Sequence, residues 1–383
     1  MNITIWLIAS FFYAYQYIIR VMPNIMIDDI CQQFDIGAAV FGQFSGIYYI
    51  GYSLVHIPVG MMLDRIGPKK VMTGCILLTV AGLLPLLFAN HWAYPIMGRF
   101  LVGMGSSGAI LGIFKIIRMI FSEQRFARML SLSVTIGLLG AIYGGGPVSY
   151  LRELFGYIPV VESFAIGGLM LAAFTYWIIP DTKEVAARSP FSDIKEVIST
   201  PNVLKTCFFA GCMVGPLEGF ADVWGTTYLH EVYGMQKTAA SSLLSLIFIG
   251  MCFGGPLLSF IAERIKSYHA TIVGAGAVMC IAFLLPPSPV SYFAVGVASA
   301  YQILAIYKAS TYVREEIAGL TTAVANMIIM TFGYGFHTII GIVTDATGIS
   351  SAITIIPIAL AIGTAGFTHI LQKGRVYDSH VFK

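Results

Sequence analysis

Ionisable side chains occur inside several long apolar stretches of this chain, and their positions carry the first functional information. A charged group in a membrane interior costs roughly 2.5–3.5 kcal/mol on insertion scales, so a group retained there is a candidate for ligand binding or proton transfer. The residues concerned are Arg20, Arg99, Lys115, Arg118, Glu218, Asp222, Lys308, His56 and His337. Arg118 lies so near the end of its stretch that we expect its side chain to reach water instead.

Arg20 closes a polar stripe in the first apolar stretch. Tyr13, Gln16, Tyr17 and Arg20 follow one another at i, i+3, i+4 and i+7, which places all four on one face of a helix. A polar face of this kind must point into a helical bundle. Arginine can hold a carboxylate through a planar, two-pronged contact. We therefore expect these four residues to bind a small anionic ligand.

The composition indicates that the elements carrying these residues cross a membrane. Soluble chains contain about a quarter charged residues, whereas this chain of 383 residues contains 11% charged and 57% hydrophobic residues, with a mean hydropathy of +0.82. The net charge of +3 gives no reason to expect nucleic acid as a partner. Its six cysteines lack metal-ligand spacing, so we expect neither a metal nor a cofactor.

About 20 largely apolar residues are needed to cross the membrane as a helix, and twelve stretches of the chain meet that criterion. They lie near residues 3–22, 41–63, 71–89, 92–117, 129–150, 158–179, 205–229, 239–262, 270–286, 290–312, 319–343 and 351–371. The fold class is therefore predicted to be an all-α integral membrane protein with twelve transmembrane helices in two pseudo-symmetric bundles of six.

The longest polar segment divides these helices into two halves. We expect an N-terminal six-helix bundle at 1–180, a cytoplasmic linker at 181–203, a C-terminal six-helix bundle at 204–372 and a cytoplasmic tail at 373–383. With the amino terminus inside, the outer loops contain only Arg152 and Lys237, and the other loop Lys and Arg residues fall on the cytoplasmic side. Both termini are therefore expected in the cytoplasm.

A dense charge cluster separates the second and third apolar stretches. Its residues form the pattern Gly60-x-x-x-Asp64-Arg65-x-Gly67-x-Lys69-Lys70. This pattern resembles the signature loop between the second and third helices of the major facilitator superfamily of secondary transporters. A weaker copy, Ala262-Glu263-Arg264-Ile265, follows the eighth stretch 199 positions later. Parallel halves of this kind build transporters with two bundles around a site at the membrane midplane.

The resemblance assigns a gating role to this loop and its copy. An acidic residue at a helix end can pair with a basic group and with the dipole of a neighbouring helix, and so hold the cytoplasmic faces together. The expected gating residues are Gly60, Asp64, Arg65, Gly67, Lys69, Glu263 and Arg264. A solvated turn that follows the positive-inside rule would explain Lys69 and Lys70, but not the glycine spacing.

Two further resemblances fall in the first half. Arg99-x-x-x-Gly103-x-Gly105 is similar to a motif of the fourth helix in this superfamily, where the arginine is associated with proton coupling or with core stability. An arginine bonded to neighbouring helix carbonyls is an equally good interpretation. The run from Tyr13 to Arg20 looks like the first helix of the organophosphate and anion-cation symporter branches, which ends in an anion-binding arginine.

The seventh stretch carries the opposite charge. Shifted back by 199 positions, Glu218 and Asp222 fall at 19 and 23, on either side of Arg20. Such a pair would suit a zwitterion, or an anion that moves together with a proton on one of the carboxylates. The alternative is an internal salt bridge between Arg20 and Glu218 with no ligand role.

Polar stripes on two later helices complete the expected cavity. Tyr301 and Lys308 lie on the tenth stretch, and Asn326 and His337 lie on the eleventh. We expect Lys308, Tyr301 and Asn326 to join Arg20, Tyr13, Tyr17 and Gln16 in substrate binding. Glu218, Asp222, Arg99 and His337 are the candidates for proton coupling. A lone membrane histidine such as His337 is more often a packing residue, although its pKa permits proton transfer.

The sequence as a whole predicts a transporter and not an enzyme. The expected activity is proton-coupled uptake, by alternating access, of a small polar metabolite such as an amino acid, a short peptide or an organic anion. The alternative is an exporter or importer of a larger compound such as a siderophore or drug. The expected location is the bacterial inner membrane, with the small-molecule substrate, protons and membrane lipid as partners, and we expect a monomer.

Overall fold

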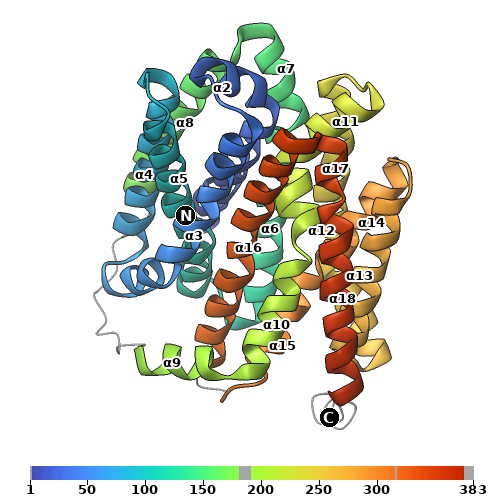
Figure 1. Cartoon of the computed structure of the whole chain (residues 1–383). Coiled ribbons are helices and arrows are strands. Elements are labelled where there is room, and N and C mark those ends of the chain that lie inside the picture. The colour runs from blue at the N-terminus through green and yellow to red at the C-terminus, as the bar shows by residue number, and fades with distance from the viewer. Residues whose placement is uncertain (1, 181–190, 315–316, 375–383) are drawn as a thin grey trace. The chain divides into compact units, whose positions relative to one another are not determined.

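The computed structural model of the chain describes residues 2–180, 191–314 and 317–374, and every regular element among them is a helix (Figure 1). The helices form two compact units, Met1–Arg188 with Gln236–Ser241, and Ser189–Met235 with Ser242–Lys383. The first ten residues of the expected linker at 181–203 lie outside the described residues, as does the expected tail from residue 375 onward.

The first unit is built from nine consecutive helical segments. They are α1 (Asn2–Val21), η1 (Met22–Met26), α2 (Ile27–Phe34), α3 (Ala38–Arg65), α4 (Pro68–Phe88), α5 (Ala93–Ile120), α6 (Glu123–Gly144), α7 (Gly146–Phe155) and α8 (Tyr157–Ile178). The 3₁₀ segment η1 follows α1 because Pro23 has no N–H to continue the α-helix.

The second unit repeats this plan with more interruptions. Its segments are α9 (Phe191–Ser199), α10 (Pro201–Cys212), η2 (Gly215–Trp224), α11 (Gly225–Tyr233), α12 (Lys237–Ile265), α13 (Tyr268–Leu284), α14 (Pro289–Ser299), α15 (Tyr301–Ser310), α16 (Ala318–Thr347), α17 (Ile349–Ile353) and α18 (Ile355–Gly374). The first residues of α12 belong to the first unit.

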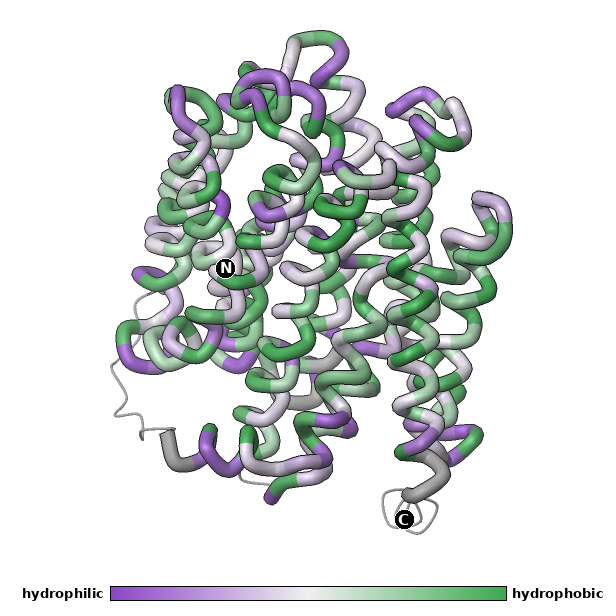
Figure 2. Tube along the Cα trace, viewed as in Figure 1, coloured by the Kyte–Doolittle hydropathy of each residue, from purple (hydrophilic) through white to green (hydrophobic). Residues whose placement is uncertain are grey.

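The predicted all-α membrane architecture is confirmed. Within the described residues, eleven helical stretches are long and apolar enough to cross a membrane, and α13 is a shorter apolar helix of 17 residues that takes the place of the expected ninth span. Figure 2 shows hydrophobic residues along the helices and hydrophilic residues gathered towards many of the helix ends. This distribution fits apolar helices that cross a membrane, and the helical backbone pairs its own polar groups there.

Glycines allow the backbones of neighbouring helices in the first unit to lie in direct contact. A Cβ atom at Gly103 of α5 would collide with the backbone carbonyl of Tyr48 in α3, and one at Gly51 of α3 would collide with the carbonyl of Phe100 in α5. Gly105 of α5 faces the other way, against the carbonyl of Cys75 in α4. The two glycines of the Arg99-x-x-x-Gly103-x-Gly105 motif therefore pack α5 against two different neighbours.

The second unit uses the same reciprocal packing. A Cβ atom at Gly250 of α12 would meet the carbonyl of Phe293 in α14, and one at Gly296 of α14 would meet the carbonyl of Ile247 in α12. Gly250 stands 199 positions after Gly51, the offset of the charged loops. The contact residues on α3 and α12 thus repeat with the 199-residue offset, whereas their partners on α5 and α14 repeat at an offset of 193.

Four expected spans are interrupted in the structure, one of which, 351–371, breaks at Thr354 between α17 and α18. The expected helix at 205–229 stops at Cys212, because Pro216 cannot donate to the Cys212 carbonyl, and continues as the π-helical η2. The expected helix at 290–312 pauses at Ala300, between α14 and α15. The expected helix at 129–150 turns at Gly145, whose ψ of −107° is not helical, before Pro147.

We predict that Gly103→Ala destabilises the protein, because the added methyl group has no space beside the Tyr48 carbonyl. Overpacking of this kind costs roughly 1–3 kcal/mol. The measurement is the melting temperature of the purified protein in detergent.

Gly167→Ala is the matched control, because Gly167 of α8 has no other atom within 4 Å of the position of an added Cβ. Both substitutions gain the same helix propensity, so their difference isolates the steric effect. Equal melting temperatures for the two variants would contradict the packing.

Candidate functional site

The polar face predicted on α1 lies in the interior of the first unit. Gln16 is 3% and Arg20 5% exposed. The Tyr48 hydroxyl of α3 donates to Oε1 of Gln16 at 2.9 Å, so the face of α1 is joined to the facing helix by a buried hydrogen bond. The structure thus brings Tyr13, Gln16, Tyr17 and Arg20 together as the sequence predicted from their spacing.

Tyrosine rings surround the Arg20 guanidinium. Its central carbon lies 5.1 Å from the ring centre of Tyr17 and 5.4 Å from that of Tyr49. The rings of Tyr13 and Tyr17 meet edge to face, with 5.1 Å between their centres. Aromatic faces stabilise a cation, so this arrangement helps to hold a positive charge at a buried position of the first unit.

Arg99 is bonded to the end of α1. Its two terminal nitrogens, Nη1 and Nη2, each donate at 2.8 Å, one to the carbonyl oxygen of Ile19 and the other to that of Arg20. The Ile19 carbonyl would normally accept from the N–H of residue 23, and Pro23 has none. Arg99 therefore replaces the missing backbone donor and fixes the last turn of α1, the turn that carries Arg20.

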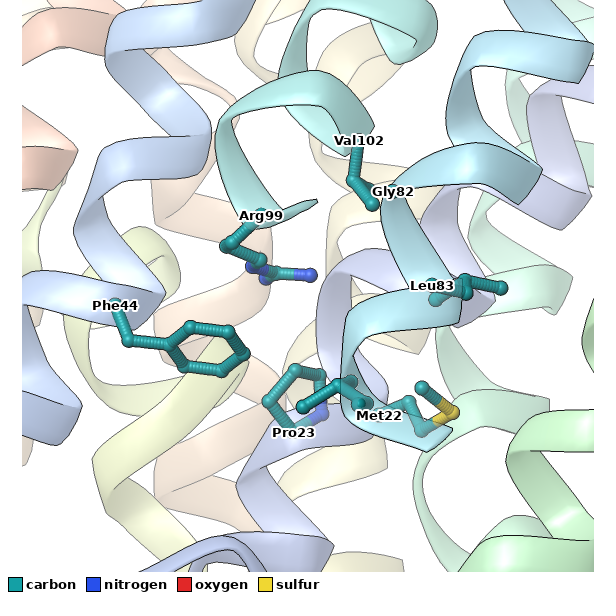
Figure 3. Close-up of a pocket in the computed structure, with 8 residues that line it drawn as sticks. Met22, Pro23, Phe44, Gly82, Leu83, Arg99 and Val102 are labelled. Atoms are coloured by element: carbon teal, nitrogen blue, oxygen red, sulfur yellow. The ribbon is translucent and has the colours of Figure 1, made fainter. Parts of the chain in front are cut away.

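A small cavity adjoins this contact, with room for about one water molecule. It is lined by Met22, Pro23, Phe44, Gly82, Leu83, Leu86, Arg99 and Val102. Figure 3 shows the Arg99 side chain reaching from α5 into the space bounded by Phe44 and the turn of Met22 and Pro23. The cavity is too small and too apolar for a metabolite, so we assign it to the packing around Arg99.

An aromatic column on α3, formed by Tyr48, Tyr52 and His56, was not predicted from the sequence. The rings of Tyr48 and Tyr52 are stacked, with 6.2 Å between their centres, and the ring centre of His56 lies 5.0 Å from that of Tyr52. The spacing i, i+4, i+8 is a helical-face signal that was present in the apolar run 41–63. Arg99 lies over the Tyr48 ring at 4.9 Å, so the column begins beside the end of α1.

The acidic pair of the second unit lies on the π-helical segment. Glu218 and Asp222 are each 1% exposed, and all ten residues of η2 are buried. A π-helical turn inside a helix is a strained feature that occurs frequently at functional sites. Both carboxylates are thus buried on an irregular element of the second unit.

The other residues expected at the site of the second unit occupy two helices. Tyr301 and Lys308 are buried on α15, and the Tyr301 hydroxyl donates at 2.7 Å to the carbonyl of Ala210, close to the end of α10. Lys308 lies over the ring of Tyr312 at 5.5 Å. On α16, His337 is buried and Asn326 is half-buried.

The charged loop of the first unit forms a tight turn with a specific partner. Gly67 has a φ of 91°, a conformation that glycine adopts easily, and this explains its place in the motif. Asp64 accepts a 2.7 Å hydrogen bond from Lys115 of α5, and the ammonium of Lys69 lies 4.6 Å from the ring centre of Tyr176 in α8. Gly60 has ordinary space, with Leu111 at 3.9 Å from an added Cβ.

The copy of this loop after α12 also contains a residue with positive φ. Lys266 stands 199 positions after Gly67 and also has a positive φ, 53°. Glu263 and Arg264 precede it in the last turn of α12. A lysine in this region is uncommon, so the fold of the second unit maintains the turn although the glycine has been lost.

Comparison with known proteins places this geometry in a family. The sequence model of the Major Facilitator Superfamily matches residues 5–336. The "Putative metabolite transport protein NicT" of Pseudomonas putida is 23% identical over 387 residues, with 89% of this chain and 86% of NicT covered. A "Putative tartrate transporter" of Agrobacterium vitis is 25% identical over 124 residues, which cover 32% of this chain and 28% of that protein.

The crystal structure of the nucleoside transporter NupG has the same fold. It matches with a TM-score of 0.78 at 15% sequence identity, with 96% of this chain and 99% of that chain covered. Since the family match takes in most of the chain and the twelve apolar helices form two similar units, this multi-pass membrane protein belongs to the Major Facilitator Superfamily and is a transporter of metabolites.

Proposed function

We propose that the protein takes up a small metabolite bearing a carboxylate, and that it does so by proton-coupled alternating access. The observation that carries this proposal is the buried Arg20, which lies between the rings of Tyr17 and Tyr49 at the end of a polar helix face. Amino acids, short peptides and organic anions all present such a carboxylate. The partial likeness to a protein named for tartrate, a dicarboxylate, agrees with this class.

In this proposal Arg20 forms the main contact with the substrate anion. Arginine offers five donors in a planar fork that matches a carboxylate. Gln16, Tyr13 and Tyr17 provide hydrogen bonds and ring surface around it in the first unit. In the second unit, the proposed substrate-binding residues are Lys308, Tyr301 and Asn326.

Glu218 and Asp222 are the proposed proton carriers. A buried carboxylate can exchange its charge for a proton and so link binding to the pH gradient. His337 is the next candidate, because it is buried on α16 of the same unit. Arg99 ranks below these three, because both of its terminal nitrogens are bonded to the carbonyls that end α1.

The charged loops are the proposed gates on the cytoplasmic side. Asp64 and Arg65 are the last two residues of the long helix α3, and Asp64 already has a basic partner in Lys115. An exposed ion pair of this kind contributes at most about 1 kcal/mol, which is small enough to break and re-form in each cycle. Glu263 and Arg264 would act at the equivalent place in the second unit.

The proposed location is a bacterial inner membrane, with both termini in the cytoplasm. This orientation follows from the Lys and Arg residues of the loops, nearly all of which fall on one side. The partners would be the small-molecule substrate, protons and membrane lipid, and the working unit a monomer, since one chain supplies both halves of the expected fold.

We predict that Arg20→Ala lowers the affinity for carboxylate ligands by about a hundredfold, or ~2.7 kcal/mol. The measurement is the ligand-induced rise in melting temperature of the purified protein, screened with amino acids, peptides and organic anions. Arg20→Lys should restore little, because an ammonium cannot reproduce the two-pronged contact.

Arg118→Ala is the matched control for Arg20→Ala, since Arg118 is an exposed arginine near the end of α5. It should bind as the wild type does. Unchanged carboxylate affinity in a folded Arg20→Ala protein would show that the anion site lies elsewhere.

For the proton, we predict that Glu218→Gln or Asp222→Asn abolishes accumulation against a gradient and leaves counterflow exchange intact. Exchange of one substrate molecule for another needs no net proton movement, whereas accumulation does. Both assays use proteoliposomes with an imposed pH gradient. Normal accumulation by both amide variants would transfer the coupling role to His337.

A further inference from the structure

The aromatic column of α3 faces the protein interior. Between Ala38 and Gly60 of this helix, the exposed residues are Gln43, Leu54 and Pro58, and they lie on one side of it. Tyr48, Tyr52 and His56 lie on the opposite side when each residue is advanced by the helical rotation. The column therefore points away from the exterior surface of its unit and belongs to the interior that the polar face of α1 also enters.

Aromatic ring contacts connect this column to Arg20. Tyr49, the neighbour of Tyr48, lies under the Arg20 guanidinium, and the rings of Tyr48 and Tyr49 meet edge to face with 5.2 Å between their centres. The Tyr48 ring in turn is stacked with that of Tyr52, with 6.2 Å between their centres. The far end of the column and the anion site are thus two parts of one tyrosine-lined region.

Two features distinguish Tyr52 and His56 from ordinary packing residues. Tyr52 is only half-buried although its neighbours Tyr48 and Tyr49 are 1% and 2% exposed, so part of its side chain remains accessible. His56 is 3% exposed, and its Nδ1 atom has no hydrogen-bond partner among the described residues. A phenylalanine would pack there without leaving a buried polar atom unsatisfied.

We propose that Tyr52 and His56 form a stacking surface for a flat ring, and that the substrate is an aromatic or heteroaromatic carboxylate. Its carboxylate lies on Arg20, its ring lies against Tyr52, and a polar atom of the ring satisfies Nδ1 of His56. This inference rests on the proposed function, because it names the substrate class of the same site. Offset stacking favours an aromatic ring over a saturated ring of similar size.

The test compares benzoate with cyclohexanecarboxylate, which carries the same charge on a non-aromatic ring. Their dissociation constants are measured on the purified, full-length protein by the rise in melting temperature with ligand concentration. We expect benzoate to bind about three- to tenfold more tightly than cyclohexanecarboxylate. Tyr52→Leu should bring this ratio close to one by weakening benzoate alone.

Three variants make the result specific. Tyr52→Phe keeps the ring and should retain the preference for benzoate, which protects the test against a folding defect in Tyr52→Leu. His56→Leu should lower the preference as Tyr52→Leu does. Tyr150→Leu removes an exposed tyrosine of α7 and should leave both affinities unchanged.

The outcomes separate this inference from the proposed function. Equal binding of the two compounds by the wild type, or an unchanged ratio in folded Tyr52→Leu, overturns the stacking surface. If Arg20→Ala still weakens both compounds in that case, the carboxylate site stands. If neither these two compounds nor any other carboxylate binds, the proposed function fails and the substrate class fails with it.

Discussion

The bond from Arg99 to the last turn of α1 is the interaction on which the first unit depends. Pro23 ends the helix and leaves the Ile19 carbonyl without its backbone donor, and the guanidinium of Arg99 takes that place while also binding the Arg20 carbonyl. Hydrogen bonds to charged groups contribute roughly 1.5–3 kcal/mol each. The side chain of Arg20 therefore projects from a turn that a second, buried arginine holds in position.

Tyr48 extends this constraint from α5 to the rest of the site. Its carbonyl lies against Gly103, one turn after Arg99, its ring lies under the Arg99 guanidinium, and its hydroxyl donates to Gln16. A larger residue at 103 would push α3 away and disturb all three contacts. The glycine motif of α5 and the polar face of α1 are thus parts of one structure, and this explains why an arginine stands so close to two glycines.

The sequence predicted the features that depend on composition and helical period. The twelve apolar helices, the place of Gly67 in a turn and the shared face of Tyr13, Gln16, Tyr17 and Arg20 all follow from residue type and spacing. The interruptions at Cys212, Ala300 and Gly145 were missed, because hydropathy does not register a break inside an apolar run. Pro216 and Pro147 explain two of these breaks, and no proline stands in the turn after Ala300. The α3 column was missed because Tyr48 and Tyr52 are apolar enough to pass as lipid-facing residues, and His56 was considered without them.

Partners distant in the sequence were the least predictable features. The pairing of Asp64 with Lys115 and of Arg99 with the α1 carbonyls joins residues 51 and about 80 positions apart. Only the close approach of α3, α1 and α5, set by glycines, brings them together. The offset of 199 positions predicted more of the structure. It relates Gly51 to Gly250, which both pack against a backbone carbonyl, and Gly67 to Lys266, which both have a positive φ.

In the proposed complex, the substrate carboxylate lies on Arg20 and the substrate ring lies on the aromatic column of α3. The most direct test is a crystal structure of the protein grown with 4-iodobenzoate, in which anomalous scattering locates the iodine atom. The account predicts an iodine peak beside the rings of Tyr52 and His56 and carboxylate density on the Arg20 guanidinium. An ordered ligand whose carboxylate contacts neither Arg20 nor the tyrosines around it would contradict the account.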